Sequence, residues 1–281
     1  MTGVRIAILQ AGSGIDPAAN ASALVAAIEQ ARAGGAAMLF TPEMSGMLDS
    51  DRLRALTKVR DEGEDDVLAA VRAAAAKAGI WVHLGSLALR GPGEKLVNRG
   101  FVIDAGGEIV ARYDKIHLFD VDLPTGESWR ESAMYAAGSE AVLVAGTPVG
   151  TLGLTICYDV RFPELFQRLS DGGADAIAVP AAFTVPTGQA HWTVLLRARA
   201  IEAEAFIIAA AQAGLHEDGR TTYGHSLIAD PWGQVVIELD GAPNLAFADL
   251  ELDRIGEVRA RIPVLEHRRA IGRIDKANGA P

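Results

Sequence analysis

The chain has 281 residues, of which 49% are hydrophobic and 22% are charged, a composition typical of a globular protein. Acidic residues outnumber basic residues by 36 to 26, which gives a net charge of -10. This charge argues against sequence-independent binding to nucleic acid or to an anionic membrane. We therefore expect no nucleic acid and no membrane among its partners.

The cysteine and histidine content excludes several other classes of site. A single cysteine allows no intramolecular disulfide and no thiolate cluster for zinc or iron–sulfur. The six histidines are scattered without the close spacing of a ligand pair, so we expect no metal and no cofactor. No stretch has the length of a membrane span, and the N-terminus lacks the pattern of a secretion signal. The expected localisation is cytoplasmic.

Hydrophobic periodicity predicts strands and helices that alternate along most of the chain. The expected strands are residues 4–10, 36–40, 80–84, 96–104, 108–113, 141–145, 150–156, 205–212, 223–238 (a hairpin) and 245–250. The expected helices run from Asn20 or Ser22 to Gly34, from Asp65 to Gly79, from about Pro163 to Leu169, from about Trp192 to Ala205, and from Leu252 to Arg261. Residues 121–140 show no clear period and predict a long ordered loop.

Two features concern the organisation of the whole chain. The order helix, Gly-Gly, strand, Pro occurs twice, ending at Pro42 and at Pro180, which indicates two similar halves. No linker divides the chain, so we expect a single domain over residues 1–265. Residues 266–281 form a basic C-terminal tail that is either exchanged with a partner subunit or disordered.

Cys157 lies where a predicted strand passes into a predicted helix. Leu152, Leu154 and Ile156 predict the buried strand, Asp159 is a possible helix cap, and Pro163 suits a first helical turn. Such a turn projects a side chain from the sheet and points backbone N–H groups at it, which would stabilise a thiolate. A lone cysteine is otherwise more often an inert core residue, so this turn alone leaves both interpretations open.

Two further residues occur in settings that suit catalysis. Glu43 directly follows a strand and has apolar neighbours, a setting that suits a carboxylate to act as a general base. Lys115 stands among an aspartate and large apolar residues, where a compact positive charge can face a reaction centre. Each residue also has an ordinary structural interpretation, as an ion-paired glutamate and a solvent-exposed lysine.

Together, the motifs around these residues resemble those of the nitrilase, or carbon–nitrogen hydrolase, superfamily, whose members carry an ordered Glu–Lys–Cys triad. The matching motifs are Thr41–Glu43, Tyr113–Asp120 and Cys157–Glu164. The resemblance extends over about residues 4–262. It implies an α/β fold, namely a four-layer alpha-beta-beta-alpha sandwich, that usually assembles as a homodimer or a higher homo-oligomer.

The resemblance also implies roles for individual residues. The catalytic residues would be Glu43, Lys115 and Cys157, together with Glu131, which matches the second glutamate of the family's long loop. Within the superfamily the chain is most similar to the amidase branch that contains deaminated glutathione amidase and omega-amidase. The sequence segments that show this similarity are Ala182–Trp192, Leu196–Glu202, Ala210–Gln212, Tyr223–Ser226 and Asp230–Gly233.

The implied activity is hydrolysis of a small carboxylate-bearing amide to an acid and ammonia through a cysteine thioester, most like deaminated glutathione amidase. The alternatives are an omega-amidase that acts on alpha-keto acid monoamides and an N-carbamoyl amino acid hydrolase. A guanidinium suits a substrate carboxylate, although Arg161 and Arg199 could each instead pair with a glutamate on the same helix. The candidate substrate-binding residues are Tyr158, Arg161, Phe183, His191 and Arg199.

Two other interpretations remain open from the sequence. One is a Cys–His hydrolase in which His117, His191 or His225 activates the cysteine, and dependence of activity on a histidine rather than on Glu43 would favour it. The other is a catalytically silent scaffold for association, which thiol labelling without any loss of amidase activity would favour.

Overall fold

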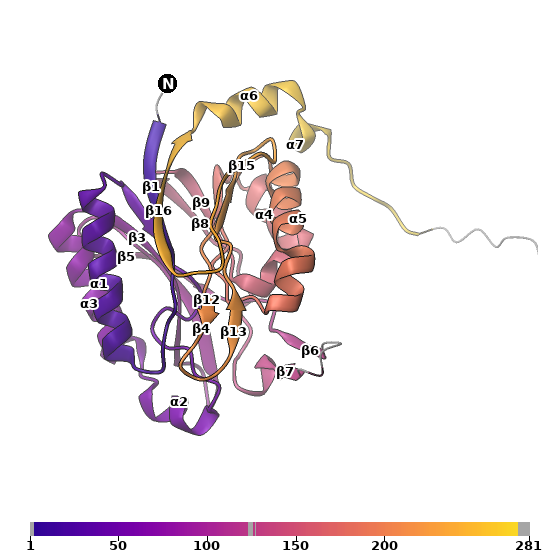
Figure 1. Ribbon diagram of the computed structural model, residues 1–281. Coiled ribbons are helices and arrows are strands. Elements are labelled where there is room, and N and C mark those ends of the chain that lie inside the picture. The colour runs from indigo at the N-terminus through magenta and orange to yellow at the C-terminus, as the bar shows by residue number, and fades with distance from the viewer. Residues whose placement is uncertain (1–2, 123–125, 127, 275–281) are drawn as a thin grey trace, which may run out of the picture.

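In residues 3–122, 126 and 128–274, which the computed structural model describes, two six-stranded sheets lie face to face and helices cover their outer faces (Figure 1). The helices on one side are α1 (Pro17–Ala33) and α3 (Asp66–Ala78), and those on the other side are α4 (Pro163–Asp171) and α5 (Val185–Ala203). This arrangement confirms the predicted four-layer sandwich.

The first sheet has the strand order β16-β1-β2-β3-β4-β5. Its neighbouring strands pair antiparallel, parallel, parallel, antiparallel and antiparallel in that order. The bounds are β1 (Gly3–Gln10), β2 (Met38–Phe40), β3 (Trp81–Arg90), β4 (Leu96–Ile103), β5 (Ile109–Asp114) and β16 (Asn244–Glu251).

The second sheet has the order β8-β9-β10-β11-β14-β15 and repeats the same sequence of pairings. Its bounds are β8 (Leu143–Thr147), β9 (Gly150–Leu154), β10 (Ala176–Ala178), β11 (Phe206–Ala209), β14 (Leu227–Ala229) and β15 (Val235–Glu238). The two similar halves predicted from the repeated Gly-Gly-strand-Pro pattern are therefore confirmed.

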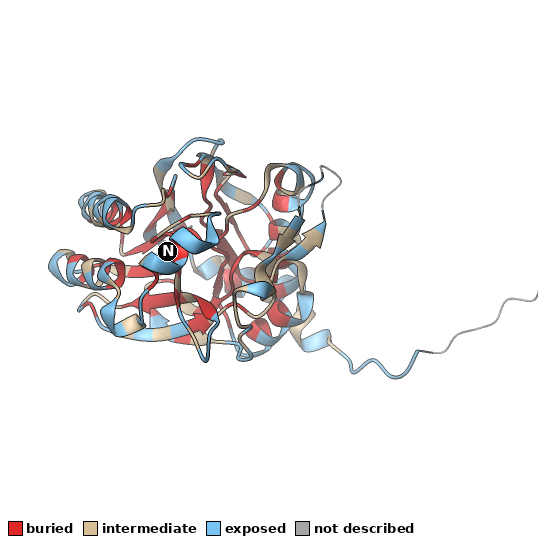
Figure 2. Cartoon of the chain, turned by 90° about the horizontal axis from the view of Figure 1, so that it is seen from below, coloured by how far each residue is buried: buried red, intermediate tan, exposed pale blue. Residues whose placement is uncertain are grey.

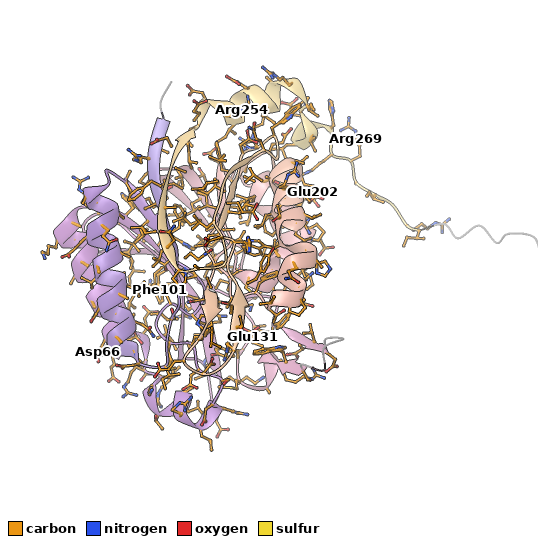
Figure 3. All side chains as sticks on the ribbon, viewed as in Figure 1. Asp66, Phe101, Glu131, Glu202, Arg254 and Arg269 are labelled. Atoms are coloured by element: carbon orange, nitrogen blue, oxygen red, sulfur yellow. The ribbon has the colours of Figure 1, made fainter. Side chains whose placement is uncertain are left out.

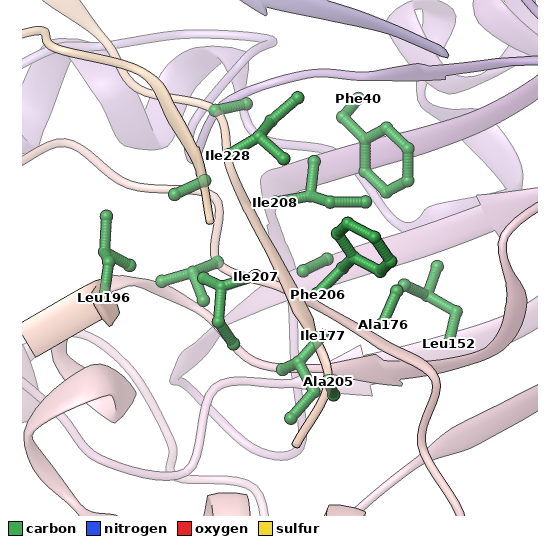
Figure 4. Close-up of a cluster of buried hydrophobic side chains, with 14 of the residues drawn as sticks. Phe40, Leu152, Ala176, Ile177, Leu196, Ala205, Phe206, Ile207, Ile208 and Ile228 are labelled. Carbon is green, nitrogen blue, oxygen red and sulfur yellow. The ribbon is translucent and has the colours of Figure 1, made fainter. Parts of the chain in front are cut away.

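The core follows from the alternation of side chains along buried strands. Phe206 and Ile208 of β11 point toward Phe40 of the other sheet, whereas Ile207 points to the opposite face, where Leu196 of α5 lies (Figure 4). Burial is accordingly greatest along the strands and the inner helix faces, and the outer helix faces are exposed (Figure 2).

Two helix caps differ from the prediction. The first helix begins at Pro17, because the Asp16 side chain accepts a hydrogen bond from the Ala18 N–H at 3.1 Å. Asn20, a predicted cap, instead binds the backbone of the loops at Gly14 and Gly46. Asp159 does not cap α4, since it belongs to the 3₁₀ turn Cys157–Arg161 that precedes that helix.

Several short elements were not predicted. Three of them gather at one end of the sandwich, the lower end in Figure 1: helix α2 (Arg52–Lys58), the hairpin β6 (Asp120–Asp122) and β7 (Ser128–Arg130), and the hairpin β12 (Ala213–Leu215) and β13 (Thr221–Tyr223). Two 3₁₀ turns lie at Glu62–Glu64 and Glu131–Ala133. The segment predicted as a long loop therefore contains a hairpin and a 3₁₀ turn.

The chain ends with two helices that pass over the top of the sandwich in Figure 1, α6 (Asp253–Arg261) and α7 (Val264–His267). Residues 269–274 lead away from the body (Figure 1). Residues 275–281 of the predicted tail lie outside the described part, so the boundary at residue 265 and the role of the tail stay predictions. No helix in the described ranges has both the length and the apolar character needed to cross a membrane.

Candidate active site

Cys157 lies at a sharp turn directly after β9. Its backbone has a φ of 52°, the left-handed region that a non-glycine residue seldom adopts, and its N–H donates to the Pro180 carbonyl at 2.8 Å. Strained backbone of this kind is concentrated at functional sites. The predicted strand-to-helix turn is confirmed, and a 3₁₀ turn forms its first helical part.

The Asp159 carboxylate holds this turn in place. It is fully buried, and it accepts hydrogen bonds from the Tyr113 hydroxyl at 2.7 Å, the Ile156 N–H at 2.8 Å and the His117 N–H at 3.0 Å. Two of these donors, Tyr113 and His117, come from a segment that is distant in the sequence from the cysteine. The turn is therefore fixed by contacts beyond its own sequence.

Glu43, Lys115 and Glu131 form a buried charged cluster. The Lys115 ammonium lies 3.0 Å from Glu43 Oε1 and 2.9 Å from Glu131 Oε2, and the lysine side chain is only 2% exposed. Glu43 follows β2, Lys115 follows β5, and Glu131 opens a 3₁₀ turn after β7. Three segments that are distant in the sequence thus bring one cation between two carboxylates.

Further donors fix both carboxylates. Asn98 Nδ2 of β4 donates to Glu43 Oε1 at 2.9 Å and lies 3.3 Å from Glu131 Oε1. The N–H of Ala182 donates to Glu43 Oε2 at 2.9 Å, and that of Phe119 donates to Glu131 Oε2 at 2.6 Å. Asn98 was not predicted, although an asparagine inside a strand with buried neighbours is a signal that could have identified it.

Burial and the charges of this cluster set the protonation states of Lys115 and Cys157. Burial raises the pKa of the Cys157 thiol well above its usual value, and the negative charge of Glu43 raises it further. Burial would lower the pKa of Lys115, but the charges of Glu131 and Glu43 outweigh it and keep that pKa well above its usual value. At neutral pH Cys157 is therefore a thiol and Lys115 is an ammonium.

A cavity of about 560 Å³ opens onto these residues. Its wall includes Glu43, Lys115, Glu131 and Cys157, and most of the remainder is apolar or aromatic. The three unpredicted elements at this end of the molecule contribute Ala55, Ser128, Trp129, Arg130 and Arg220 to the wall. Glu131 lies at the same end (Figure 3). A largely apolar cavity with a few polar groups at one place is typical of a small-molecule site.

The structure separates the predicted substrate-binding residues into two groups. Tyr158 and Phe183 line the cavity. Arg161 and His191 are not among the described residues that line the cavity. The Arg161 guanidinium instead lies 3.2 Å from His191 Nδ1 and over the rings of Tyr158 and Phe183. These two residues therefore pair with each other beside the cavity.

Arg199 has a structural environment. Its side chain is 7% exposed, and it donates to the Val160 carbonyl at 2.9 Å and to Glu202 at 2.7 Å. Of the two interpretations that the sequence left open for Arg199, the structure shows the one in which it pairs with a glutamate on the same helix. It also connects α5 to the cysteine turn.

The histidines of the alternative Cys–His scheme lie elsewhere. His117 Nδ1 lies 2.7 Å from Asp159 Oδ1, and His225 Nδ1 lies 3.6 Å from Glu238. Among the described residues that line the cavity there is no histidine. The geometry therefore places a glutamate, rather than a histidine, next to the thiol.

The family model described as Carbon-nitrogen hydrolase matches residues 5–260. The chain belongs to the carbon–nitrogen hydrolase family. This carbon–nitrogen hydrolase is 38% identical over 274 residues to the deaminated glutathione amidase of Yersinia enterocolitica, covering 96% of this chain and 95% of the relative. The predicted family is thus confirmed, and the protein is a hydrolase that acts on carbon–nitrogen bonds.

Solved structures agree with this assignment. The hydrolase superposes on the Caenorhabditis elegans NitFhit protein with a TM-score of 0.87 and 37% identity, covering 95% of this chain and 65% of that one, so it spans less than two thirds of NitFhit. A mutant of the amidase from Nesterenkonia sp. AN1 gives a TM-score of 0.79 and 27% identity, with 95% and 94% covered. That structure shows covalent addition of the acetamide moiety of fluoroacetamide at the active-site cysteine.

Proposed function

We propose that this hydrolase is an amidase that cleaves a small carboxylate-bearing amide through a thioester on Cys157, with deaminated glutathione as the preferred candidate substrate. The observation that carries the proposal is that Cys157, Glu43 and Lys115 line one cavity, where the Lys115 ammonium lies 3.0 Å from Glu43 Oε1. The name of the Yersinia relative supports the substrate, and the cysteine adduct of the Nesterenkonia amidase supports the nucleophile.

In the first half of the reaction, Glu43 takes the thiol proton and the sulfur attacks the amide carbonyl carbon, forming a carbon–sulfur bond. Lys115 and the Tyr158 backbone N–H stabilise the resulting oxyanion. Glu43 then gives its proton to the substrate nitrogen as the carbon–nitrogen bond breaks. An amine or ammonia leaves, and a thioester remains on Cys157.

In the second half, Glu43 takes a proton from a water molecule whose oxygen attacks the thioester carbonyl. The same two donors stabilise the second oxyanion. When the carbon–sulfur bond breaks, the sulfur recovers the proton from Glu43 and the carboxylic acid leaves. Glu131 keeps Lys115 in position and charged throughout, because its two oxygens lie 2.9 and 3.1 Å from the ammonium.

The test compares the purified enzyme with its Cys157→Ala variant on deaminated glutathione, alpha-ketoglutaramate and an N-carbamoyl amino acid. Mass spectrometry follows the carboxylic acid product, which forms whether an amine or ammonia leaves. We expect turnover by the wild type only, with deaminated glutathione preferred. Activity that persists without the cysteine would refute the mechanism, and preference for the carbamoyl compound would replace the amidase assignment while leaving the triad intact.

A second comparison separates the two nucleophile-activation schemes. Glu43→Gln should abolish turnover, whereas His117→Asn should retain it if the protein folds normally. The reverse result would favour the Cys–His hydrolase, and a folded wild type that is inactive on every amide would favour the scaffold.

Two further expectations accompany the proposal. We infer a homodimer that forms through the outer helices, because Val194 and Ile201 lie seven residues apart on one face of α5 and are 70% and 49% exposed. The cytoplasmic localisation stays a prediction from the sequence.

A further inference from the structure

Besides the Glu43–Lys115–Glu131 cluster, the described cavity wall carries three charged residues, Asp49, Arg130 and Arg220. Two of them are fully engaged. Both oxygens of Asp49 accept from Arg54 at 2.7 Å. The terminal nitrogens of Arg130 donate to the carboxylate of Asp122 at 2.8 and 2.9 Å and to two backbone carbonyls.

Arg220, on the turn between β12 and β13, is different. Its Nε donates to Asp218 Oδ2 at 2.7 Å, and its guanidinium lies over the Trp129 ring at 5.3 Å from the centroid. Within the described chain, neither of its terminal nitrogens has a hydrogen-bond partner. The two contacts fix the plane of the guanidinium and leave its outer edge available to a ligand in the cavity.

The Asp218 carboxylate holds this arginine in place. Its side chain is fully buried, and its Oδ2 also accepts the Ser50 N–H at 2.7 Å, which ties the β12–β13 turn to the segment before α2. Burial would raise the pKa of Asp218, but hydrogen bonds and the charge of Arg220 lower it overall. The support is therefore ionised, and it holds the guanidinium through Nε alone.

The indole N–H of Trp129 is a second indication of a ligand-binding site. Its indole Nε1–H is buried and has no acceptor in the part of the chain that the structure describes, while the residue lines the cavity. A buried donor without a partner costs free energy, and a bound acceptor would offset that cost. Trp129 and Arg220 are in contact, so one ligand group could reach both.

Arg220 shares one cavity with the reaction centre. Cys157, Glu43 and Lys115 line this cavity together with Arg220. A single small substrate could therefore place its amide at Cys157 and a second group at Arg220.

We propose that Arg220 is the specificity-determining residue of this hydrolase and binds the substrate carboxylate that is distal to the scissile amide, with the Trp129 indole N–H as a second donor. A planar guanidinium whose two terminal nitrogens have no partner among the described residues can bind a carboxylate bidentately. The inference rests on the proposed amidase function and names the residue that selects the substrate class.

The kinetic test uses two series of primary amides with matched carbon numbers: the monoamides of dicarboxylic acids from succinate to suberate, and the corresponding unbranched fatty amides. We expect the wild type to prefer at least one carboxylated member over its neutral counterpart. Arg220→Gln should lower kcat/KM for that member by roughly 10- to 100-fold and change kcat/KM for the neutral amide less than about threefold. Arg130→Gln, which removes a cation that is already engaged, is the matched control and should preserve the preference.

Two more variants separate recognition from folding. Arg220→Lys keeps a positive charge and should recover part of the preference, while Trp129→Phe keeps the ring and should reduce the preference several-fold. Melting temperatures identify any variant that is simply unfolded. Equal losses on both series in Arg220→Gln, or no loss on either, would overturn the proposal and leave the amidase function standing.

A binding measurement makes the two proposals distinguishable. In the Cys157→Ala background, calorimetry measures the affinity for the dicarboxylates from succinate to suberate and for the matching monocarboxylates. We expect Arg220→Gln to weaken binding of the preferred dicarboxylate at least tenfold and Arg130→Gln to leave it unchanged. If Arg220→Gln weakens dicarboxylate binding but the wild type hydrolyses no amide, the amidase function is rejected and the carboxylate-binding site is kept. If the affinity for dicarboxylates does not depend on Arg220, the carboxylate-binding site is rejected.

Discussion

Lys115 determines the charge balance of the catalytic cluster. It is the cation between Glu43 and Glu131, and all three side chains are almost completely removed from solvent. A buried charge that loses its partner typically costs about 3 to 5 kcal/mol of folding free energy. Loss of one oxyanion donor typically costs about 3 to 4 kcal/mol of activation free energy. In the proposed mechanism Lys115 therefore supports stability and catalysis for different reasons.

These two roles can be separated by experiment. Lys115→Met should lower kcat by at least about 100-fold and also lower the free energy of unfolding, because two carboxylates then lack a counterion. Adding Glu131→Gln restores the original net charge of the cluster, so the double variant should regain stability without regaining turnover. Urea denaturation and product formation measure the two effects, and a Lys115→Met enzyme within tenfold of wild-type kcat would show that the ammonium does not stabilise the oxyanion.

The sequence predicted individual residues when each one lay inside its own short motif. Glu43, Lys115 and Cys157 follow strands whose hydrophobic pattern is clear, and the structure brings Glu43, Lys115 and the thiol together as expected. Arg220 could not be predicted, because the feature that distinguishes it from Arg199 is a free guanidinium edge. That feature depends on contacts with Trp129 and Asp218, which no local pattern reports.

At the scale of elements, the cysteine turn depends on strand β5 as much as on strand β9. Tyr113 of β5 reaches Asp159 inside the turn, and Arg99 of β4 pairs with Asp114 of β5 at 2.7 Å, next to Lys115. Strand β5 therefore positions both the ammonium and the turn that carries the thiol.

Tyr113→Phe should consequently lower the free energy of unfolding by about 1 to 3 kcal/mol, the usual effect of removing a hydrogen bond to a buried charge. Turnover should fall less than about threefold, because Asp159 retains the N–H groups of Ile156 and His117. Tyr223→Phe is the control, since within the described residues that hydroxyl makes no hydrogen bond, and it should change stability less than about 0.5 kcal/mol. If the two variants are equally stable, the Tyr113 hydroxyl does not stabilise the fold through its hydrogen bond to Asp159.

Helices and strands with a strong hydrophobic periodicity were predictable from the sequence. Elements with a weak hydrophobic periodicity were not. The strands of both sheets were expected because their apolar residues face two cores. Helix α2 has seven residues with one buried side chain, Ala55, and none of the described residues in strands β6 and β7 is fully buried. Contacts such as the Ser50 to Asp218 hydrogen bond hold this end of the molecule together, so its structure depends on tertiary contacts that periodicity does not report.

At the scale of the whole molecule, the two halves are in close contact beside the active site. Pro42 and Pro180 follow the equivalent strands β2 and β10, and Gly85 of β3 lies between them. A Cβ atom at Gly85 would overlap the carbonyl oxygens of Thr41 and Pro42 and lie 2.6 Å from the Pro180 Cβ. The glycine therefore allows the segment that carries Glu43 to pack against the segment that leads to Ala182.

Gly85→Ala should accordingly destabilise the protein by about 3 kcal/mol or more, because the overlapping atoms belong to backbone and a proline ring, which cannot rotate away. Turnover should fall as well, since relief of the overlap displaces Glu43. Gly256→Ala adds the same methyl group in helix α6, where nothing lies within 4 Å, and should be neutral or stabilise by up to about 1 kcal/mol. Urea denaturation of both variants gives the comparison. A Gly85→Ala protein as stable and as active as the wild type would mean that the two halves have room to separate here without disturbing the catalytic carboxylate.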